Sequence, residues 1–292
     1  MDKHILKISD LCKNYDKFSL KNINLSLKEG EVLGLIGQNG AGKSTTIKSL
    51  LGLISYDSGT ILIDNEVMDT DNIKLKHEIG YVPENVFLYQ DIKCYEFYKF
   101  VKSCYKSWDD DLFLNLSKKF ELDLEKKIKE LSKGNLVKFL IIIAISHHPK
   151  LLILDEPTSG LDPIIRNQVI DYLKDVVKNE RCSILFSSHI TEDISKLADV
   201  VTYMDNGKIL LSERKDTILN EYKKVVFKMG IPSDICKKYK YVFNNVIMVN
   251  KESELENLES ELSEYYVENI TLDEVLTILV NSERRENVSV NC

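Results

Sequence analysis

The sequence lacks a long apolar run, because its longest one, Phe139 to Ile145, is far short of the roughly 18 residues that cross a bilayer. It also lacks a basic excess: 39 lysines and arginines stand against 46 acidic residues, for a net charge of −7. A nucleic-acid surface needs a basic stripe, so this balance argues against nucleic acid as a partner. We therefore expect no segment to span a membrane by itself, and the acidic balance favours a cytosolic enzyme.

Paired cysteines are also missing. The six cysteines are scattered, with no CxxC pair and no histidine at metal-ligand spacing beside one. This pattern fits reduced thiols in a cytosolic protein better than a disulfide framework or a zinc site. The N-terminus leads straight into a strand-like segment, so we expect no signal peptide. At 292 residues, of which 43% are hydrophobic, the chain can form one or two globular domains.

Hydrophobic patterning predicts strands that alternate with helices, which is typical of a parallel sheet. Strands are expected at 23–27, 31–36, 151–154 and 183–187. Helices are expected from near Gly42 to about Leu53, over 136–146 and over 165–178. The dipeptide Asn206-Gly207 predicts a hairpin that joins strands at 200–204 and 208–212.

The character of the chain changes near residue 215. We expect a main domain over 1–215, with a mainly helical part at about 86–148, and a small accessory α+β domain over 216–292. In the accessory domain, strand-like pieces occur at 224–229 and 241–249. A last helix is expected from Thr271, because Thr271 and Glu274 have capping-box spacing.

A phosphate-loop pattern, G-x-x-x-x-G-K-[ST], is matched by Gly37-Gln38-Asn39-Gly40-Ala41-Gly42-Lys43-Ser44-Thr45. The glycines let backbone N–H groups converge on phosphate oxygens, and the following helix presents its positive end to them. Lys43 would add charge near the β- and γ-phosphates, and Ser44 would offer its hydroxyl to Mg²⁺. The alternative is a glycine-rich turn without a ligand, but an apolar strand precedes the motif and a helix-forming stretch follows it.

Acidic and basic side chains follow two further predicted strands. Asp155 and Glu156 end the strand at 151–154, and His189 ends the strand at 183–187. Ligands bind at the carboxyl ends of parallel strands, so we expect Asp155 to hold Mg²⁺, Glu156 to activate water and His189 to sense the γ-phosphate. The alternative for the two acids is a strand that runs out into a solvated turn. The other four histidines are expected at the surface or at helix ends.

The ordered set GQNGAGKST (37–45), LSKGN (131–135), LLILDEPTSGLD (151–162) and SSH (187–189) resembles the ATP-binding subunits of ABC transporters. The resemblance covers about the first 215 residues and is greatest to export-type bacterial ATPases of the bacitracin-resistance and acetoin-operon kind. It implies an α/β fold: a P-loop NTPase core with an antiparallel β subdomain and an inserted helical subdomain. It also implies ATP and Mg²⁺ as ligands.

The resemblance assigns roles that spacing alone does not. Ser132 and Gly134 should contact the γ-phosphate bound to a partner subunit, from the start of the helix that follows them. Asp162 should lie at the dimer interface and help to place the attacking water. Tyr15 occupies the position of the aromatic residue that stacks on adenine, although a purely structural role in a turn before Phe18 is the alternative.

This chain departs from the family pattern in two places. The family usually has LSGGQ, whereas here Lys133 and Asn135 replace two of those residues. Lys133 either adds positive charge near the γ-phosphate or is a solvated surface lysine. The family often has glutamine after Tyr-Val-Pro, whereas this chain has Glu84. A carboxylate there can still reach Mg²⁺ or its water, but it adds a negative charge.

Partners follow from the same resemblance. The aromatic-rich segment 85–100 either helps to form a groove for a membrane permease subunit or belongs to the core of the helical part. We expect an ATPase that powers an exporter from the cytoplasmic face of the membrane, as a homodimer or as a heterodimer with a second ATP-binding subunit. The rival is a soluble ATP-switched regulator of the same family. Such regulators usually carry two nucleotide domains in one chain, whereas this chain has one.

Overall fold

The computed structural model describes residues 3–68, 72–85, 90–180, 182–228, 230–250, 254–255 and 265–289. The chain forms two compact units, Met1–Ile209 and Leu210–Cys292. Across the described ranges, every helix is too short or too polar to cross a membrane.

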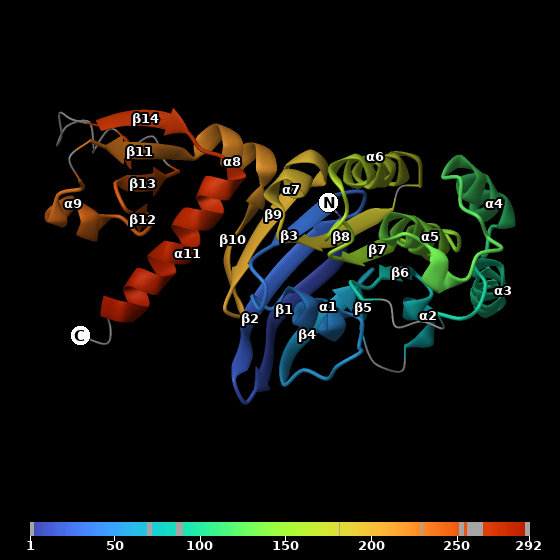
Figure 1. The fold of residues 1–292 in the computed structure, drawn as a ribbon. Helices are drawn as coiled ribbons and strands as arrows, with labels where there is room; N and C mark the ends of the chain where they lie inside the picture. Colours follow the sequence, from blue (N-terminus) through green and yellow to red (C-terminus); the bar gives the residue numbers. More distant parts are fainter. Residues whose placement is uncertain are drawn as a thin grey trace. The chain divides into compact units, whose positions relative to one another are not determined.

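The main sheet has six strands in the order β10-β9-β3-β8-β7-β6 (Figure 1); all of them lie in the first unit except β10, which contains the boundary at Ile209. Its strands are β3 (Val32–Ile36), β6 (Ile79–Val82), β7 (Leu151–Asp155), β8 (Ser183–Ser188), β9 (Val200–Asp205) and β10 (Lys208–Arg214). Strand β3 pairs in parallel with β8 and β9, and β7 pairs in parallel with β6 and β8. The carboxyl ends of β3, β7 and β8 therefore meet at one edge, as the apolar runs predict.

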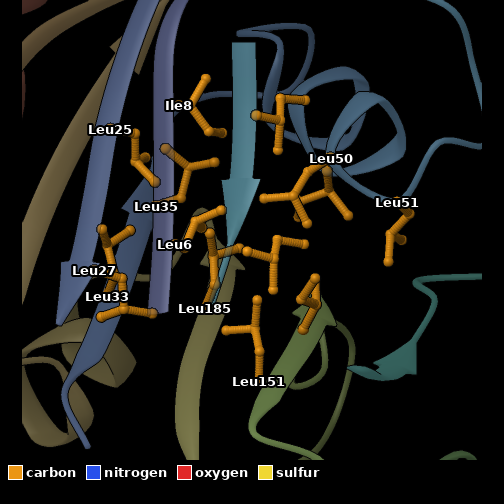
Figure 2. Packing of buried hydrophobic residues seen from close by; sticks show 14 of the residues in the cluster. Leu6, Ile8, Leu25, Leu27, Leu33, Leu35, Leu50, Leu51, Leu151 and Leu185 are labelled. Atoms are coloured by element: carbon orange, nitrogen blue, oxygen red, sulfur yellow. The ribbon is translucent and has the colours of Figure 1, made fainter. Parts of the chain in front are cut away.

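A four-stranded antiparallel sheet, ordered β2-β1-β4-β5, packs beside the first sheet. Its strands are β1 (His4–Tyr15), β2 (Phe18–Lys28), β4 (Ser58–Ile63) and β5 (Glu66–Val67). Side chains of both sheets share one core with helix α1 (Lys43–Leu50), where Ile8, Leu35, Leu50 and Leu185 are buried (Figure 2). Each fully buried leucine or isoleucine contributes about 2 kcal/mol, so this core holds the start of α1 rigidly.

The helical part of the first unit has its own smaller core. It comprises α3 (Cys94–Cys104), α4 (Asp110–Lys119), the 3-10 turn η1 (Ile128–Glu130) and α5 (Lys133–Ile145). Phe97, Tyr98, Phe113 and Phe139 are buried together in this core, and Tyr98 stacks on Phe113. The remaining helices of this unit are α2 (Ile73–Lys76), α6 (Pro163–Glu180) and α7 (Thr191–Leu197).

The second unit contains a four-stranded antiparallel sheet with the order β12-β13-β11-β14. Its elements are α8 (Lys215–Glu221), β11 (Lys223–Phe227), α9 (Ser233–Lys238), β12 (Val242–Phe243), β13 (Val246–Val249), β14 (Tyr265–Asn269) and α11 (Leu272–Ser289). A small apolar cluster that includes Val225, Ile235 and Ile247 is buried against the sheet. Thr271 and Glu274 make the predicted reciprocal capping contacts at the start of α11.

Two expected elements differ from the structure. Helix α1 ends at Leu50 rather than Leu53, because the backbone of Gly52 adopts φ +64° and ends the turn. The expected strand 241–249 is two strands, β12 and β13, joined by a turn in which Asn244 adopts φ +51°. Asn244 and Asn245 interrupt the apolar run at this turn, and asparagine is a turn-forming residue, so the sequence contains a signal for two strands that the expected single strand overlooks.

Candidate active site

The phosphate loop connects the carboxyl end of β3 to the start of α1, as the sequence predicts. Gly42 caps α1 in a left-handed conformation, with φ +112°, which only glycine adopts at little cost. A Cβ atom on Gly42 would lie 2.8 Å from Leu20 Cδ2, so the Leu20 side chain would have to shift if another residue replaced this glycine. The loop therefore leaves its backbone N–H groups and the positive end of α1 available to an anion.

Lys43 is nearly buried and is held between the loop and a carboxylate. Its ammonium donates to the Gly37 carbonyl oxygen at 2.7 Å and lies 3.0 Å from Glu156 Oε1. Only 6% of the Lys43 side chain and 5% of the Glu156 side chain are exposed. A buried ion pair of this kind interacts strongly because little water screens it.

Asp155 ends β7 and connects two hydroxyl groups. Ser44 Oγ donates to Asp155 Oδ1 at 3.2 Å, and Ser187 Oγ donates to the same oxygen at 2.7 Å. Asp155 is 2% exposed, so its carboxylate faces the protein and not bulk water. The two serines come from α1 and β8, and this places the phosphate-loop hydroxyl beside the first acidic residue.

Glu156 begins the turn after β7, and its backbone is strained. Its φ is +52°, an uncommon left-handed conformation for a residue with a side chain. Its N–H donates to Ser187 Oγ at 2.9 Å, and its Oε2 lies 2.8 Å from His189 Nδ1. Glu156 therefore connects the phosphate loop to the end of β8, because one of its oxygens contacts Lys43 and the other contacts His189.

The phosphate loop borders a cavity of about 430 Å³. It is lined by Phe18, Gln38, Asn39, Gly40, Ala41, Gly42, Lys43, Ser44, Thr45, Glu84 and Glu156. Tyr81, next to this site, has a pKa raised to about 12, mainly by burial and also by the charges of Asp155 and Glu84. Glu84 and Glu156 thus place carboxylates in the same cavity as the phosphate loop.

The donor groups beside the phosphate loop suit a magnesium ion that arrives with its substrate. Among the described residues no three His, Cys, Asp or Glu side chains are placed to hold a metal alone. Mg²⁺ usually takes only one or two carboxylates and completes its shell with water and substrate phosphates. Ser44, Asp155 and Glu84 fit that requirement. The Ser44 hydroxyl donates a hydrogen bond to Asp155, and Glu84 lines the phosphate-loop cavity together with Ser44.

Three predicted partner-facing residues lie outside this cavity. Ser132 caps α5, where its Oγ accepts from the Asn135 N–H at 3.3 Å. Gly134 is in the first turn of α5, where a Cβ atom would lie 2.6 Å from Ile165 Cγ2. Asp162 is exposed and caps α6, accepting from the Ile164 and Ile165 N–H groups. The structure does not bring these three residues to the chain's own phosphate loop.

Tyr15 also lies outside the lining of the cavity. It is 46% exposed, with the Lys13 ammonium 5.4 Å from its ring centroid. Its hairpin partner Phe18 lines the cavity instead, so sequence reasoning missed Phe18 as the aromatic residue beside the phosphate loop. Tyr15 and Phe18 are paired across the hairpin and so share one face of the sheet, and no motif in the sequence singles out Phe18.

The aromatic segment 85–100 divides between core and surface. Phe97 and Tyr98 are buried in the helical core, whereas Tyr95 and Phe100 are 38% and 59% exposed. Phe87 and Tyr89 lie outside the described residues.

Comparison with known proteins agrees with this geometry. The family model described as "ABC transporter" matches residues 20–159. The lantibiotic transport ATP-binding protein SrtF of Streptococcus pyogenes is 36% identical over 73% of this chain and 92% of its own length. The linearmycin resistance ATP-binding protein LnrL of Bacillus subtilis (strain 168) is 34% identical over 70% of this chain and 68% of its own.

A solved structure supports the same assignment. The protein cbiO1 from Clostridium perfringens, described as part of the ABC transporter complex cbiONQ, matches with a TM-score of 0.64 and 30% identity. The match covers 73% of this chain and 89% of that one. These relatives are transporter ATP-binding proteins, which favours a transporter subunit over the soluble regulator. This chain belongs to the ATP-hydrolysing ATP-binding proteins of the ABC transporter family.

Proposed function

We propose that the chain powers an export-type ABC transporter by binding MgATP between two ATP-binding subunits and hydrolysing it. The observation that carries this proposal is the meeting of Lys43, Asp155 and Glu156 at one sheet edge, beside the phosphate-loop cavity. Residues 1–215 would form the ATP-binding domain and residues 216–292 an accessory domain. The named relatives that act in lantibiotic transport and linearmycin resistance support export as the direction.

The chemistry would follow from charge and position. The loop N–H groups and Lys43 bind the β- and γ-phosphates, and Lys43 exchanges its contacts with Gly37 and Glu156 for phosphate oxygens. Ser44, Asp155 and Glu84 would hold Mg²⁺, which when bound neutralises phosphate charge. Glu156 accepts a proton from water as the water oxygen attacks the γ-phosphorus and the bond to the ADP oxygen breaks. His189 holds Glu156 in place from the end of β8.

A second ATP-binding subunit would complete each site. Ser132, Gly134 and Asp162 do not line the phosphate-loop cavity of their own chain, yet the family pattern gives them γ-phosphate and interface roles. The exposed start of α5, with Ser132 as its cap, presents free N–H groups that suit a phosphate held by a partner subunit. This arrangement is consistent with either a homodimer or a heterodimer.

A separate groove of about 350 Å³ would receive the permease. It is lined by Leu51, Leu53, Met68, Lys76, Ile79, Tyr81, Val101, Tyr105, Ile143, Ala144 and His147. Leu53 is 61% exposed among largely apolar lining residues, so an apolar segment of a partner would bury it. We propose that a helical segment of the permease docks here and holds the ATPase at the cytoplasmic face of the membrane.

Two measurements test these proposals. The purified chain should hydrolyse ATP in a Mg²⁺-dependent way, and an absence of turnover under all conditions would count against the catalytic assignment. Leu53→Asp should abolish co-purification with membranes that contain the permease. Leu114→Asp is the matched control, because Leu114 is 47% exposed on α4 and does not line the groove. Equal membrane association of both variants would exclude this groove as the docking surface, whereas a wild type that does not co-purify with these membranes would favour a soluble regulator.

A further inference from the structure

Asp193 is a buried carboxylate that the chemistry proposed above does not use. It lies on α7, shortly after His189, and it is 0% exposed. Its Oδ2 accepts a hydrogen bond from Thr158 Oγ1 at 2.6 Å, and its Oδ1 lies 3.3 Å from Arg166 Nε. Burial raises the pKa of Asp193, whereas the Thr158 hydroxyl and the Arg166 charge oppose the rise. A charged group in this place therefore depends on both partners, because burial of an unpaired carboxylate is costly.

The two partners of this carboxylate flank the loop that follows Glu156. Thr158 is 0% exposed and lies in a turn in which the Ser159 N–H donates to the Glu156 carbonyl oxygen at 3.2 Å. Arg166 lies in the first turn of α6, where its N–H donates to the Asp162 carbonyl oxygen at 2.9 Å. One carboxylate therefore holds both ends of the segment that contains the expected interface residue Asp162.

The segment that runs from β8 into α7 contacts the turn at Glu156 at two points. His189 Nδ1 lies 2.8 Å from Glu156 Oε2, and Asp193 accepts the hydrogen bond from Thr158. The left-handed φ of +52° at Glu156 is strained, and such a conformation persists only where the surrounding structure fixes it. The contact with His189 fixes the Glu156 carboxylate, and the contact with Asp193 fixes the backbone that follows it.

We propose that Asp193 is a positioning residue for ATP hydrolysis that acts through Thr158 and Arg166. Its carboxylate fixes the loop between these two residues, and the fixed loop holds Glu156 in place. This inference rests on the proposed role of Glu156 as the base. A misplacement of about 1 Å can cost about 10²-fold in rate, so loss of these contacts slows hydrolysis. ATP binding is preserved, because neither Asp193 nor Thr158 lines the phosphate-loop cavity.

Variants of the two hydrogen-bonded residues separate the rate of hydrolysis from the affinity for ATP. Thr158→Val removes the hydroxyl and keeps the shape of the side chain, and Asp193→Asn keeps the size and removes the charge. Each should lower kcat per mole of bound nucleotide by about 10- to 100-fold. The Kd for a fluorescent ATP analogue with Mg²⁺ should change less than about twofold, because only an interaction made in the transition state is lost. The double variant should be no slower than the slower single variant, because residues that act as a unit are not additive.

Control variants separate positioning from packing. Thr158→Ser keeps the hydroxyl and should retain wild-type kcat. Glu192→Gln should also retain it, because Glu192 is next to Asp193 on α7 and pairs with Arg166, but its side chain is 56% exposed.

The outcomes distinguish this inference from the proposed function. If Thr158→Val and Asp193→Asn only lower the unfolding temperature and keep wild-type kcat per bound nucleotide, Asp193 is a structural residue and the inference is wrong. Where Asp193→Asn does not fold, the comparison of Thr158→Val with Thr158→Ser decides in the same way. If the wild type hydrolyses no ATP, or if Glu156→Gln hydrolyses it at the wild-type rate, the proposed function fails instead.

Discussion

The Lys43 ammonium lies 3.0 Å from Glu156 Oε1, and both side chains are almost completely buried. This ion pair joins the residue expected to bind phosphate to the residue expected to activate water. The other oxygen of Glu156 lies 2.8 Å from His189 Nδ1, so the carboxylate is fixed at both ends. A base held in this way needs little reorganisation when a water molecule is placed beside it.

Glu156→Gln should nearly abolish ATP turnover, by about 10²- to 10⁴-fold, because an amide does not accept the proton from water. ATP binding should survive, and a nucleotide-bound dimer should accumulate on size-exclusion chromatography with MgATP. Glu125→Gln is the matched control, since Glu125 is largely exposed, pairs with Lys93 and does not line the phosphate-loop cavity. Wild-type turnover by Glu156→Gln would refute its assignment as the base.

Lys43→Ala should weaken ATP binding itself by about 10- to 100-fold, because a charge-assisted contact to phosphate is lost. The same change leaves Glu156 without its buried cation, so the thermal unfolding temperature should be measured alongside. Lys48→Ala provides the control, because Lys48 is exposed on the same helix. Equal ATP affinity for the two variants would contradict the phosphate-loop interpretation.

Asp155→Asn should raise the Mg²⁺ concentration that gives half-maximal turnover by about tenfold, because a neutral amide attracts the cation less strongly. The amide keeps the size of the side chain and one oxygen that can accept from Ser44 and Ser187, so the fold should be preserved. Removal of Mg²⁺ with EDTA should stop turnover by the wild type, and added Mg²⁺ should restore it. Turnover that persists in EDTA would show that no divalent cation takes part.

The sheet edge and its acidic residues could be predicted from the sequence because continuous apolar runs specify strands that are buried on both faces. Strands β7 and β3, predicted from the runs 151–154 and 31–36, are buried at every position, and parallel pairing of each with β8 brings their ends together. Local rules also predict the hairpin at Asn206-Gly207 and the cap at Thr271. These features depend on neighbouring residues only, so a single sequence contains enough information about them.

Features that depend on packing between residues far apart in the sequence could not be predicted from the sequence alone. Phe18 lines the phosphate-loop cavity, whereas Tyr15, its partner across the hairpin, does not, and motif spacing does not distinguish the two. The sequence predicts His147 at the surface or at a helix end; it does follow α5, but it is 3% exposed and stacks on Tyr105 at 4.0 Å between ring centroids. That burial arises from the end of α3 and from β6, which are far away in the sequence.

His147 gives the last prediction, which concerns stability and pH. The pKa of His147 is lowered to about 4, mainly by burial; the charges of His77 and His148 act in the same direction, while a hydrogen bond to the Ile79 carbonyl and the charge of Glu78 oppose the shift. In the unfolded chain His147 has an ordinary pKa of about 6.5. Between about pH 6.5 and about pH 4 the unfolded chain therefore binds a proton at His147 that the folded chain does not bind. Stability should fall as the pH drops from about 6.5 toward about 4.

Replacing His147 with Phe should remove this pH dependence, because Phe keeps an aromatic ring against Tyr105 and has no proton to bind. Between about pH 7.5 and about pH 5 the wild type should lose about 2 kcal/mol more unfolding free energy than His147→Phe. Urea unfolding at both pH values measures the difference, and other titrating groups cancel between the two proteins. An equal loss in both would mean that the imidazole is protonated in the folded chain despite its burial, and the groove would then carry a positive charge beside Tyr105.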